Sequence, residues 1–261
     1  MVLAAVEQRV AEFDRVYSRF RDDSLVARIA REAGSYDFPP DAGPLFDLYR
    51  RLYEATDGAV TPLVGAALEG LGYDRAYSLQ PSGAARAVPP WDEAFAWDGS
   101  RLTVLRPVTV DVGAAGKGYL VDLVADLLRD KAIDECVVDA SGDMLHRGGD
   151  SLRVALEHPL DATKAIGVYE LRNRALCASA TNRRRWGGGL HHIIDVATGL
   201  PTSRVIATWA IADTALLADG LATALFFAGE HELSGFDFEF VRMFSNGHVE
   251  HSAQFDGELF L

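Results

Sequence analysis

A glycine-rich segment from Asp111 to Tyr119 (DVGAAGKGY) has residue types that can hold an anion. Glycines allow backbone amides to turn toward a ligand, the N-terminus of a following helix favours negative charge, and Lys117 adds a positive charge. The spacing fits neither the Walker A loop, which has Ser or Thr where Gly118 stands, nor the Rossmann GxGxxG pattern. The segment therefore predicts either a phosphate site or a tight strand-to-helix turn with a surface lysine.

Asp219 and Thr223 lie four residues apart in a segment that is otherwise apolar, so they share one face of a predicted helix. A carboxylate is costly to bury unless it is paired or bound to a cation. Carboxylate and hydroxyl oxygens are hard ligands that suit Mg²⁺. The alternative is a carboxylate on a solvated stripe, with the Thr223 hydroxyl bonded to its own helix backbone.

Two further acids, Asp139 and Asp143, flank three small residues at the end of a predicted strand. Asp, Ser and Gly in such a run are typical of a turn. The small side chains also allow a ligand to approach the backbone. The sequence leaves both interpretations open.

Adjacent histidines, His191 and His192, precede Asp195 and a Thr198-Gly199 turn. In one continuous strand, His192 and Ile194 would share one face, and His191, Ile193 and Asp195 the other. Two rings on opposite faces do not reach one metal ion, which argues against a two-histidine metal site. A single histidine at a strand end is a candidate base, although a lone histidine is also a common structural residue.

The elements that must position these residues follow from periodicity and turn signals. Helices are predicted over 2–33, with a new start near Ser24, over 41–56, from the glycine-rich segment to about Asp130, and over 213–228. A loop that could mark a subdomain seam is predicted over 78–100. Strands are predicted at 101–105, 108–112, 136–140, 152–157, 165–171, 175–178, 205–212, 239–244 and 248–252. Helices early and strands late favour an α+β fold over a regular βαβ series.

The bulk composition narrows the class of partner. The chain has 261 residues, 49% of them hydrophobic, so it can bury a core. Its net charge is −13, whereas a nucleic-acid-binding protein needs a positively charged surface. An anionic ligand would need a metal, a helix N-terminus or a local cluster such as Arg183, Arg184 and Arg185. No apolar run approaches the roughly 18 residues of a membrane span. The N-terminus has no basic segment, long apolar core or lipobox-like cysteine, so we expect a cytoplasmic protein.

The order of these motifs along the chain resembles the ApbE family, the FAD:protein FMN transferases. The matching stretches lie between residues 17 and 230: 17–24 (YSRFRDDS), 57–62 (DGAVTP), 111–119 (DVGAAGKGY), 139–143 (DASGD), 192–199 (HIIDVATG) and 218–223 (ADGLAT). The resemblance implies a single α+β unit over residues 1–261, made of two mixed α/β subdomains with largely antiparallel sheets.

The resemblance also implies a role for individual residues. Asp111 and Lys117 would contact FAD, residues 58–61, with Ala59, Val60 and Thr61, would line the flavin pocket, and Phe20 and Ile193 would also lie at the cofactor. The Ala114 carbonyl, Asp219 and Thr223 would hold Mg²⁺, with Asp219 counted among the catalytic residues, and His192 would assist transfer. The family's usual opening strand with Met-Gly-Thr is not found in this sequence, and residues 60–63 read Val-Thr-Pro-Leu instead of Phe-Asp-Pro-Thr. We expect the first difference to affect cofactor affinity and the second to alter the flavin pocket.

The implied reaction is cleavage of the FAD pyrophosphate and transfer of FMN to a threonine of an acceptor flavoprotein, with release of AMP. Two alternatives use the same residues. With water as the acceptor the protein would be an FAD pyrophosphatase, and without catalysis it would be a flavin-binding protein.

Overall fold

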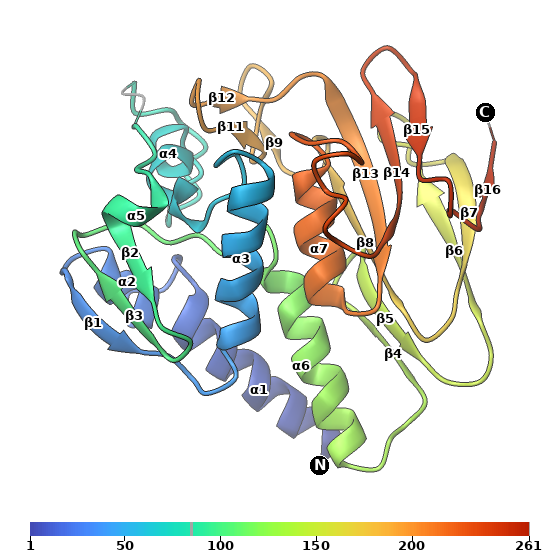
Figure 1. Cartoon of the computed structure of the whole chain (residues 1–261), viewed down its shortest axis with the longest axis horizontal. Helices are drawn as coiled ribbons and strands as arrows, with labels where there is room; N and C mark the ends of the chain where they lie inside the picture. Colours follow the sequence, from blue (N-terminus) through green and yellow to red (C-terminus); the bar gives the residue numbers. More distant parts are fainter. Residues whose placement is uncertain (84–85, 261) are drawn as a thin grey trace.

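The computed structural model describes residues 1–83 and 86–260. Most of its helices lie in the N-terminal part of the chain and most of its antiparallel strands in the C-terminal part (Figure 1). The N-terminal part is mostly helical, with α1 (Val2–Tyr17), α2 (Leu25–Ile29), α3 (Gly43–Ala55), a 3₁₀ turn (Pro62–Val64), α4 (Gly65–Gly70) and α5 (Trp91–Ala94). This part also contains a small antiparallel sheet in the order β1-β3-β2, made of β1 (Gly34–Asp37), β2 (Phe95–Trp97) and β3 (Arg101–Val104). The predicted α+β class is confirmed.

A six-stranded antiparallel sheet forms the centre of the C-terminal part, in the order β15-β14-β13-β8-β5-β4. Its strands are β4 (Cys136–Asp139), β5 (Asp143–Arg147), β8 (Ala175–Ala180), β13 (Val205–Ala212), β14 (Glu239–Phe244) and β15 (Val249–His251). A three-stranded sheet in the order β16-β7-β6 consists of β6 (Leu152–Glu157), β7 (Ala165–Leu171) and β16 (Glu258–Leu259). Short strand pairs β9/β10 (Arg185–Trp186, Leu190–His191) and β11/β12 (Ile194–Asp195, Leu200–Pro201) lie between β8 and β13 in the chain.

Both faces of the central sheet are covered, and β13 shows this residue by residue. Ala210 and Ala212 belong to the core shared with helices α6 (Gly116–Asp130) and α7 (Ala215–Ala224). Trp209 and Ile211 belong to a second core shared with β6 and β7. Side chains alternate across a strand, so a strand covered on both faces becomes apolar throughout, as 205–212 is. Figure 1 shows α6 and α7 side by side next to the sheet.

Local sequence signals explain several helix starts. The Ser24 hydroxyl accepts a hydrogen bond from the Ala27 amide and begins α2, as the Asp22-Asp23-Ser24 pattern predicts. Thr214 begins α7 in the same way through the Leu217 amide. The Asp122 carboxylate on α6 accepts from the Ala215 and Leu216 amides, so α6 also caps α7. These caps fix the helix that carries Asp219.

Four predicted strands, at 152–157, 165–171, 205–212 and 239–244, have the predicted bounds. The strand predicted at 108–112 is wrong. The segment is extended and buries alternate valines, but it joins no sheet in the described chain. Its Asp111 amide donates instead to the Pro62 carbonyl (2.8 Å). An extended segment threaded through a core has the same alternation as a strand, so periodicity does not distinguish the two.

Other boundaries also differ from the predictions. The segment predicted as helix to residue 33 contains only the short α2 after Ser24, and the helix predicted over 213–228 is the shorter α7. The predicted loop 78–100 contains α5 and β2, while its residues 84 and 85 lie outside the described residues. Strand β5 was not predicted, because its start at Asp143 coincides with a turn signal.

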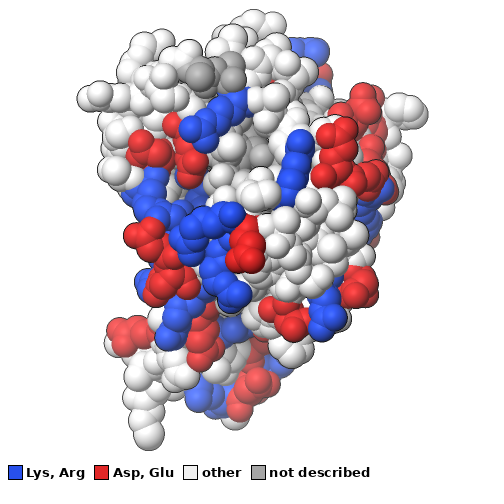
Figure 2. Space-filling model, turned by 90° about the vertical axis from the view of Figure 1, so that its left-hand side faces the viewer, with Lys and Arg blue, Asp and Glu red and all other residues white. Residues whose placement is uncertain are grey.

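Acidic and basic side chains lie close together on one side of the molecule. Figure 2 shows acidic and basic side chains interleaved over the side of the molecule that lies at the left of Figure 1. Ion pairs at the surface, among them Arg50 with Glu54 and Arg101 with Asp37, also bring opposite charges together. Within the described ranges, no helix combines the length and the hydropathy that crossing a membrane requires.

Candidate active site

A cavity of about 770 Å³ opens between the N-terminal helices, the glycine-rich segment and the central sheet. Its volume lies in the range of small-molecule sites. Each residue that the sequence analysis assigns to cofactor, metal or catalysis lines it: Phe20, Ala59, Val60, Thr61, Asp111, Ala114, Lys117, His192, Ile193, Asp219 and Thr223. These residues come from five separate parts of the chain, so the fold gathers them at one place.

At one end of the cavity, Lys117, Asp219 and Thr223 line the wall and Asp143 lies buried behind Lys117; we call these four residues the acidic end. Lys117 forms an ion pair with Asp143, whose side chain is fully buried at the start of β5. Asp219 is buried on α7, and its Oδ2 accepts from the Gly118 amide at 2.9 Å. Thr223, one turn further along α7, donates to the Ala114 carbonyl at 3.3 Å. The face of α7 that carries Asp219 and Thr223 therefore points into the cavity and not toward bulk solvent.

Gly118 makes this arrangement sterically possible. A Cβ atom at this position would lie 2.0 Å from the Ala215 carbonyl oxygen and 2.7 Å from the Asp219 Cβ. Only glycine allows α6 and α7 to approach so closely. Gly118, which stands where a Walker A loop has Ser or Thr, thus brings the Asp219 carboxylate to the helix N-terminus.

The charges at the acidic end do not balance. Burial raises the pKa of Asp219 well above its usual range, and the neighbouring Asp143 raises it further, against the opposing effect of Lys117. Burial also raises the pKa of Asp143, although Lys117 opposes it. Two buried carboxylates therefore share one ammonium group. An additional cation would relieve this repulsion.

The donor set at the acidic end fits Mg²⁺. A carboxylate, a hydroxyl and a backbone carbonyl are hard oxygen donors, and Mg²⁺ commonly takes only one or two carboxylates and completes its shell with water and substrate phosphates. Residues 1–83 and 86–260 contain no group of three or more His, Cys, Asp or Glu side chains that would form an all-protein metal cage.

The amides of the glycine-rich segment are largely occupied within the protein. The Gly113 amide donates to Asp111, the Ala114 amide to the Tyr49 hydroxyl, and the Gly118 amide to Asp219. The amides of residues 115 and 116 donate to the Val112 carbonyl. A backbone cradle for phosphate, one of the two predicted interpretations, therefore has few free donors here. Neutralisation of a pyrophosphate would come from Lys117 and a cation.

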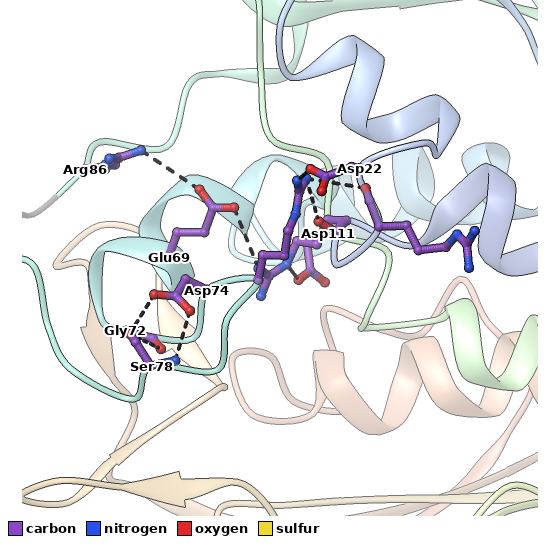
Figure 3. Close-up of polar contacts among 10 residues, drawn as sticks. Asp22, Glu69, Gly72, Asp74, Ser78, Arg86 and Asp111 are labelled. Carbon is purple, nitrogen blue, oxygen red and sulfur yellow. Dashed lines mark hydrogen bonds and ion pairs between the residues drawn. The ribbon is translucent and has the colours of Figure 1, made fainter.

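The other end of the cavity, which we call the aromatic end, consists of Arg19, Phe20, Tyr73, Tyr77 and Asp111. Phe20 stacks on Tyr77 with ring centroids 4.9 Å apart and meets the Tyr73 ring edge-on. Arg19 Nε donates to the Asp111 carboxylate at 2.5 Å. Asp111 is labelled in Figure 3. Burial would raise the pKa of Asp111, but the Arg19 charge and hydrogen bond outweigh it, so this pKa is lowered. Asp111 is thus a fixed carboxylate.

The two histidines have different environments. His191 is buried outside the cavity lining, where its Nε2 lies 2.8 Å from the Thr202 carbonyl and its Nδ1 accepts from the Ile193 amide. His192 lines the cavity, and its Nδ1 is buried without a hydrogen-bond partner among the described residues. Burial, together with the Arg184 and His191 charges, lowers the pKa of His192 to about 3. His192 is therefore a neutral imidazole with an available nitrogen.

The strand expected across these histidines is interrupted. β10 ends at His191 and β11 begins at Ile194, with a bend between them. The expected alternation of faces is therefore wrong at this point, because His192, Ile193 and Ile194 all line the cavity. A two-residue bend allows consecutive side chains to face one space, which a continuous strand forbids.

Several residues of the site carry no functional signal in the sequence. Arg19 and Asp143 fall inside stretches that carried the resemblance, but an isolated arginine or aspartate gives no sign of its burial. Tyr73 and Tyr77 lie in a segment without a motif. Arg183 and Arg184, part of the cluster noted for its charge, do line the cavity.

Comparisons with known proteins agree on one family. The family model described as the ApbE family matches residues 2–236. An FAD:protein FMN transferase of Treponema pallidum (strain Nichols) is 31% identical over 247 residues, which cover 83% of this chain and 68% of that protein. An FAD:protein FMN transferase of Vibrio cholerae is 28% identical over 242 residues, covering 86% and 72%.

Solved structures show the same fold. The ApbE protein of Thermotoga maritima superposes with a TM-score of 0.81 at 23% identity, covering 97% of this chain and 89% of that one. The flavin transferase ApbE of Vibrio cholerae gives a TM-score of 0.78 at 23% identity, with the same coverage.

Proposed function

This chain belongs to the ApbE family, and from that premise we propose that it is a Mg²⁺-dependent FAD:protein FMN transferase that modifies a threonine of an acceptor flavoprotein. One observation carries the proposal: a neutral histidine and a buried, charge-unbalanced acidic end line the same cavity. Pyrophosphate cleavage with transfer to a hydroxyl needs both a site for negative charge and a proton acceptor.

The reaction exchanges one bond to phosphorus for another. The acceptor threonine oxygen forms a bond to the FMN-side phosphorus, and the bond from that phosphorus to the oxygen of AMP breaks. The threonine proton passes to His192, whose lowered pKa keeps it unprotonated before the reaction. An imidazole with so low a pKa is a weak base, but the negative charge of bound pyrophosphate raises the pKa of a nearby histidine and so strengthens it.

The acidic end would hold the cation. Asp219, Thr223 and the Ala114 carbonyl are the proposed ligands, and Lys117 would stand beside the diphosphate. A divalent cation supplies neutralisation of the pyrophosphate charge and of the charge that develops on AMP. Phe20, Ala59, Val60, Thr61 and Ile193 would surround the rest of FAD, and Asp111 would contact it from the aromatic end.

The test is a product analysis with and without an acceptor. The protein is mixed with FAD and Mg²⁺, and then with a candidate acceptor flavoprotein, while AMP, FMN and acceptor mass are followed. We expect AMP together with an FMN-sized mass increase on a threonine peptide, and no increase when that threonine is replaced by valine. Release of AMP and free FMN without acceptor modification would replace the transferase with a pyrophosphatase. FAD binding without AMP release would leave a flavin-binding protein.

A further inference from the structure

Arg19 is a buried cation whose hydrogen-bonding capacity is only partly used. Its side chain is 4% exposed and lines the cavity from the turn between α1 and α2. Nε donates to Asp111, but neither Nη1 nor Nη2 has a hydrogen-bond partner among the described residues. Buried donors without partners are rare because each loses its hydration without compensation. The two Nη atoms therefore form a fork of unused donors that is itself covered, in a side chain that lines the cavity.

The surroundings hold this fork rigidly. The guanidinium carbon lies 4.3 Å from the centroid of the Phe20 ring and 5.0 Å from that of Tyr73. Stacking on aromatic faces leaves the in-plane N–H groups free to bind a ligand. The backbone is also braced, since the Arg75 guanidinium donates to the Arg19 carbonyl at 3.4 Å. A donor pair that is fixed before binding loses little entropy when it binds.

The charge of Arg19 is already compensated. Asp111 pairs with it directly, and Glu69 Oε1 lies 3.9 Å from Nη1, which is too far for a hydrogen bond (Figure 3). Glu69 also lies 4.0 Å from Arg86. A phosphate would favour a cation without neighbouring carboxylates. A neutral group with two adjacent acceptor atoms suits this fork better.

The two flat ring systems of FAD differ in whether one edge carries two adjacent acceptor atoms. Arginine pairs bidentately with adjacent acceptors, as with O6 and N7 of guanine, whereas an adenine edge offers an acceptor beside an amino donor. The isoalloxazine ring has two acceptor–acceptor edges, N5 with the C4 carbonyl and N1 with the C2 carbonyl. We propose that the Arg19 fork binds one of these edges and is a specificity-determining residue that distinguishes the flavin half of FAD from other adenosine pyrophosphates. This inference rests on the proposed function.

The test compares ligands that share some of these groups. Equilibrium dissociation constants are measured in EDTA, to prevent turnover, for FAD, 5-deaza-FAD, 1-deaza-FAD and ADP. Each deaza analogue replaces one ring acceptor by C–H. The proteins are the wild type, Arg19→Lys, which keeps a charge for Asp111 but lacks the fork, and Arg75→Lys as the control. Arg75 braces the same turn and does not line the cavity.

We expect Arg19→Lys to bind FAD about tenfold more weakly or worse, because a good bidentate pair discriminates by about 1–3 kcal/mol. ADP affinity should stay within about twofold, and Arg75→Lys should resemble the wild type. One deaza analogue should bind the wild type about tenfold more weakly than FAD, and this difference should disappear in Arg19→Lys.

Several results would overturn the inference. Wild-type FAD affinity in Arg19→Lys is one, and an equal loss for FAD and ADP, which would place the fork on phosphate, is another. If the variant does not fold, as judged by its thermal melt, the deaza analogues on the wild type decide alone, and equal affinity for all three flavins contradicts the proposal. Failure of the wild type to bind any flavin would instead remove the proposed function and the inference with it.

Discussion

The acidic end and the aromatic end of the cavity are built from different kinds of structure. Lys117, Asp143, Asp219 and Thr223 stand on α6, β5 and α7, which pack against one another in the main core. Arg19, Phe20, Tyr73, Tyr77 and Asp111 stand on turns and irregular segments. Charged groups at the acidic end are thus fixed by regular elements, as precise phosphoryl chemistry requires. The aromatic end offers rings and paired charges, which suit recognition of a neutral flat group.

The largest expected effect comes from removing the carboxylate at the acidic end. Asp219→Ala should lower FAD turnover about 10³-fold or more, because the proposed cation ligand is lost. The fold should persist, since the variant removes one of two repelling buried acids. AMP release as a function of Mg²⁺ concentration, with a thermal melt, measures both effects. Unchanged Mg²⁺ dependence in this variant would rule the assignment out.

The histidine pair gives the next largest effect. His192→Ala should lower transfer to the acceptor about 10²-fold or more while FAD and metal still bind, because a base contributes to the chemical step. His191→Ala should keep transfer but lose about 1–3 kcal/mol of stability, since its ring bridges Thr202 and Ile193. Acceptor mass, AMP release and melting temperature are compared for the two variants. Equal transfer by both would mean that the histidine assignment is wrong.

Gly118→Ala tests the contact between α6 and α7. The added Cβ would meet the Ala215 carbonyl, so the helices must separate. We expect a loss of about 1–3 kcal/mol in the free energy of unfolding and a turnover defect, because Asp219 loses its place at the Gly118 amide. Gly235→Ala, at an exposed glycine with open space around it, is the control. Wild-type stability and turnover in Gly118→Ala would show that this close approach is dispensable.

Lys117→Ala should weaken FAD binding, and it should also destabilise the fold, because Asp143 loses its only ion-pair partner in the described structure. Since Lys117 is partly exposed, we expect about 1–3 kcal/mol, less than for a fully buried pair. Adding Asp143→Asn should restore stability but not FAD affinity. If the double variant regains both, Lys117 acts only as the partner of Asp143.

The last effect is a dependence of stability on acid pH. His192 has a folded-state pKa of about 3, below the value of about 6.5 for an unfolded histidine. Between these values the unfolded chain binds more protons, so the stability from a neutral His192 is complete above about pH 6.5 and is lost as the pH falls toward 3. His192→Gln should therefore lose less stability than the wild type between pH 7 and pH 4 in denaturant titrations. Parallel losses would show that this imidazole is not held neutral.

The sequence predicted the regular elements best where one physical cause dominated. Strand 205–212 is apolar because both faces are covered, and α2 begins where Ser24 can cap it. The valines of 108–112 predicted a strand because any buried extended segment alternates. The bend at residues 192–193 depends on contacts that are distant in sequence. Periodicity alone therefore gave the wrong faces for this segment.

For the site, the motifs indicated residues that lie at one cavity, but they did not indicate the partners of those residues. The assigned residues all line one cavity, although they stand on turns, on short extended segments and within α7. The ion pairs of Lys117 with Asp143 and of Arg19 with Asp111 join residues 26 and 92 positions apart. A single sequence gives no signal for such a pair.

A titration of divalent metal tests the central claim most directly. Mn²⁺, which is paramagnetic and prefers the same oxygen ligands as Mg²⁺, is added to the wild type, Asp219→Asn and Arg19→Lys, each with ADP, and bound metal is followed by electron paramagnetic resonance. We predict one tightly bound Mn²⁺ in the wild type and in Arg19→Lys, and weakening of at least tenfold in Asp219→Asn. Identical Mn²⁺ binding by the wild type and Asp219→Asn would contradict a metal site at the acidic end.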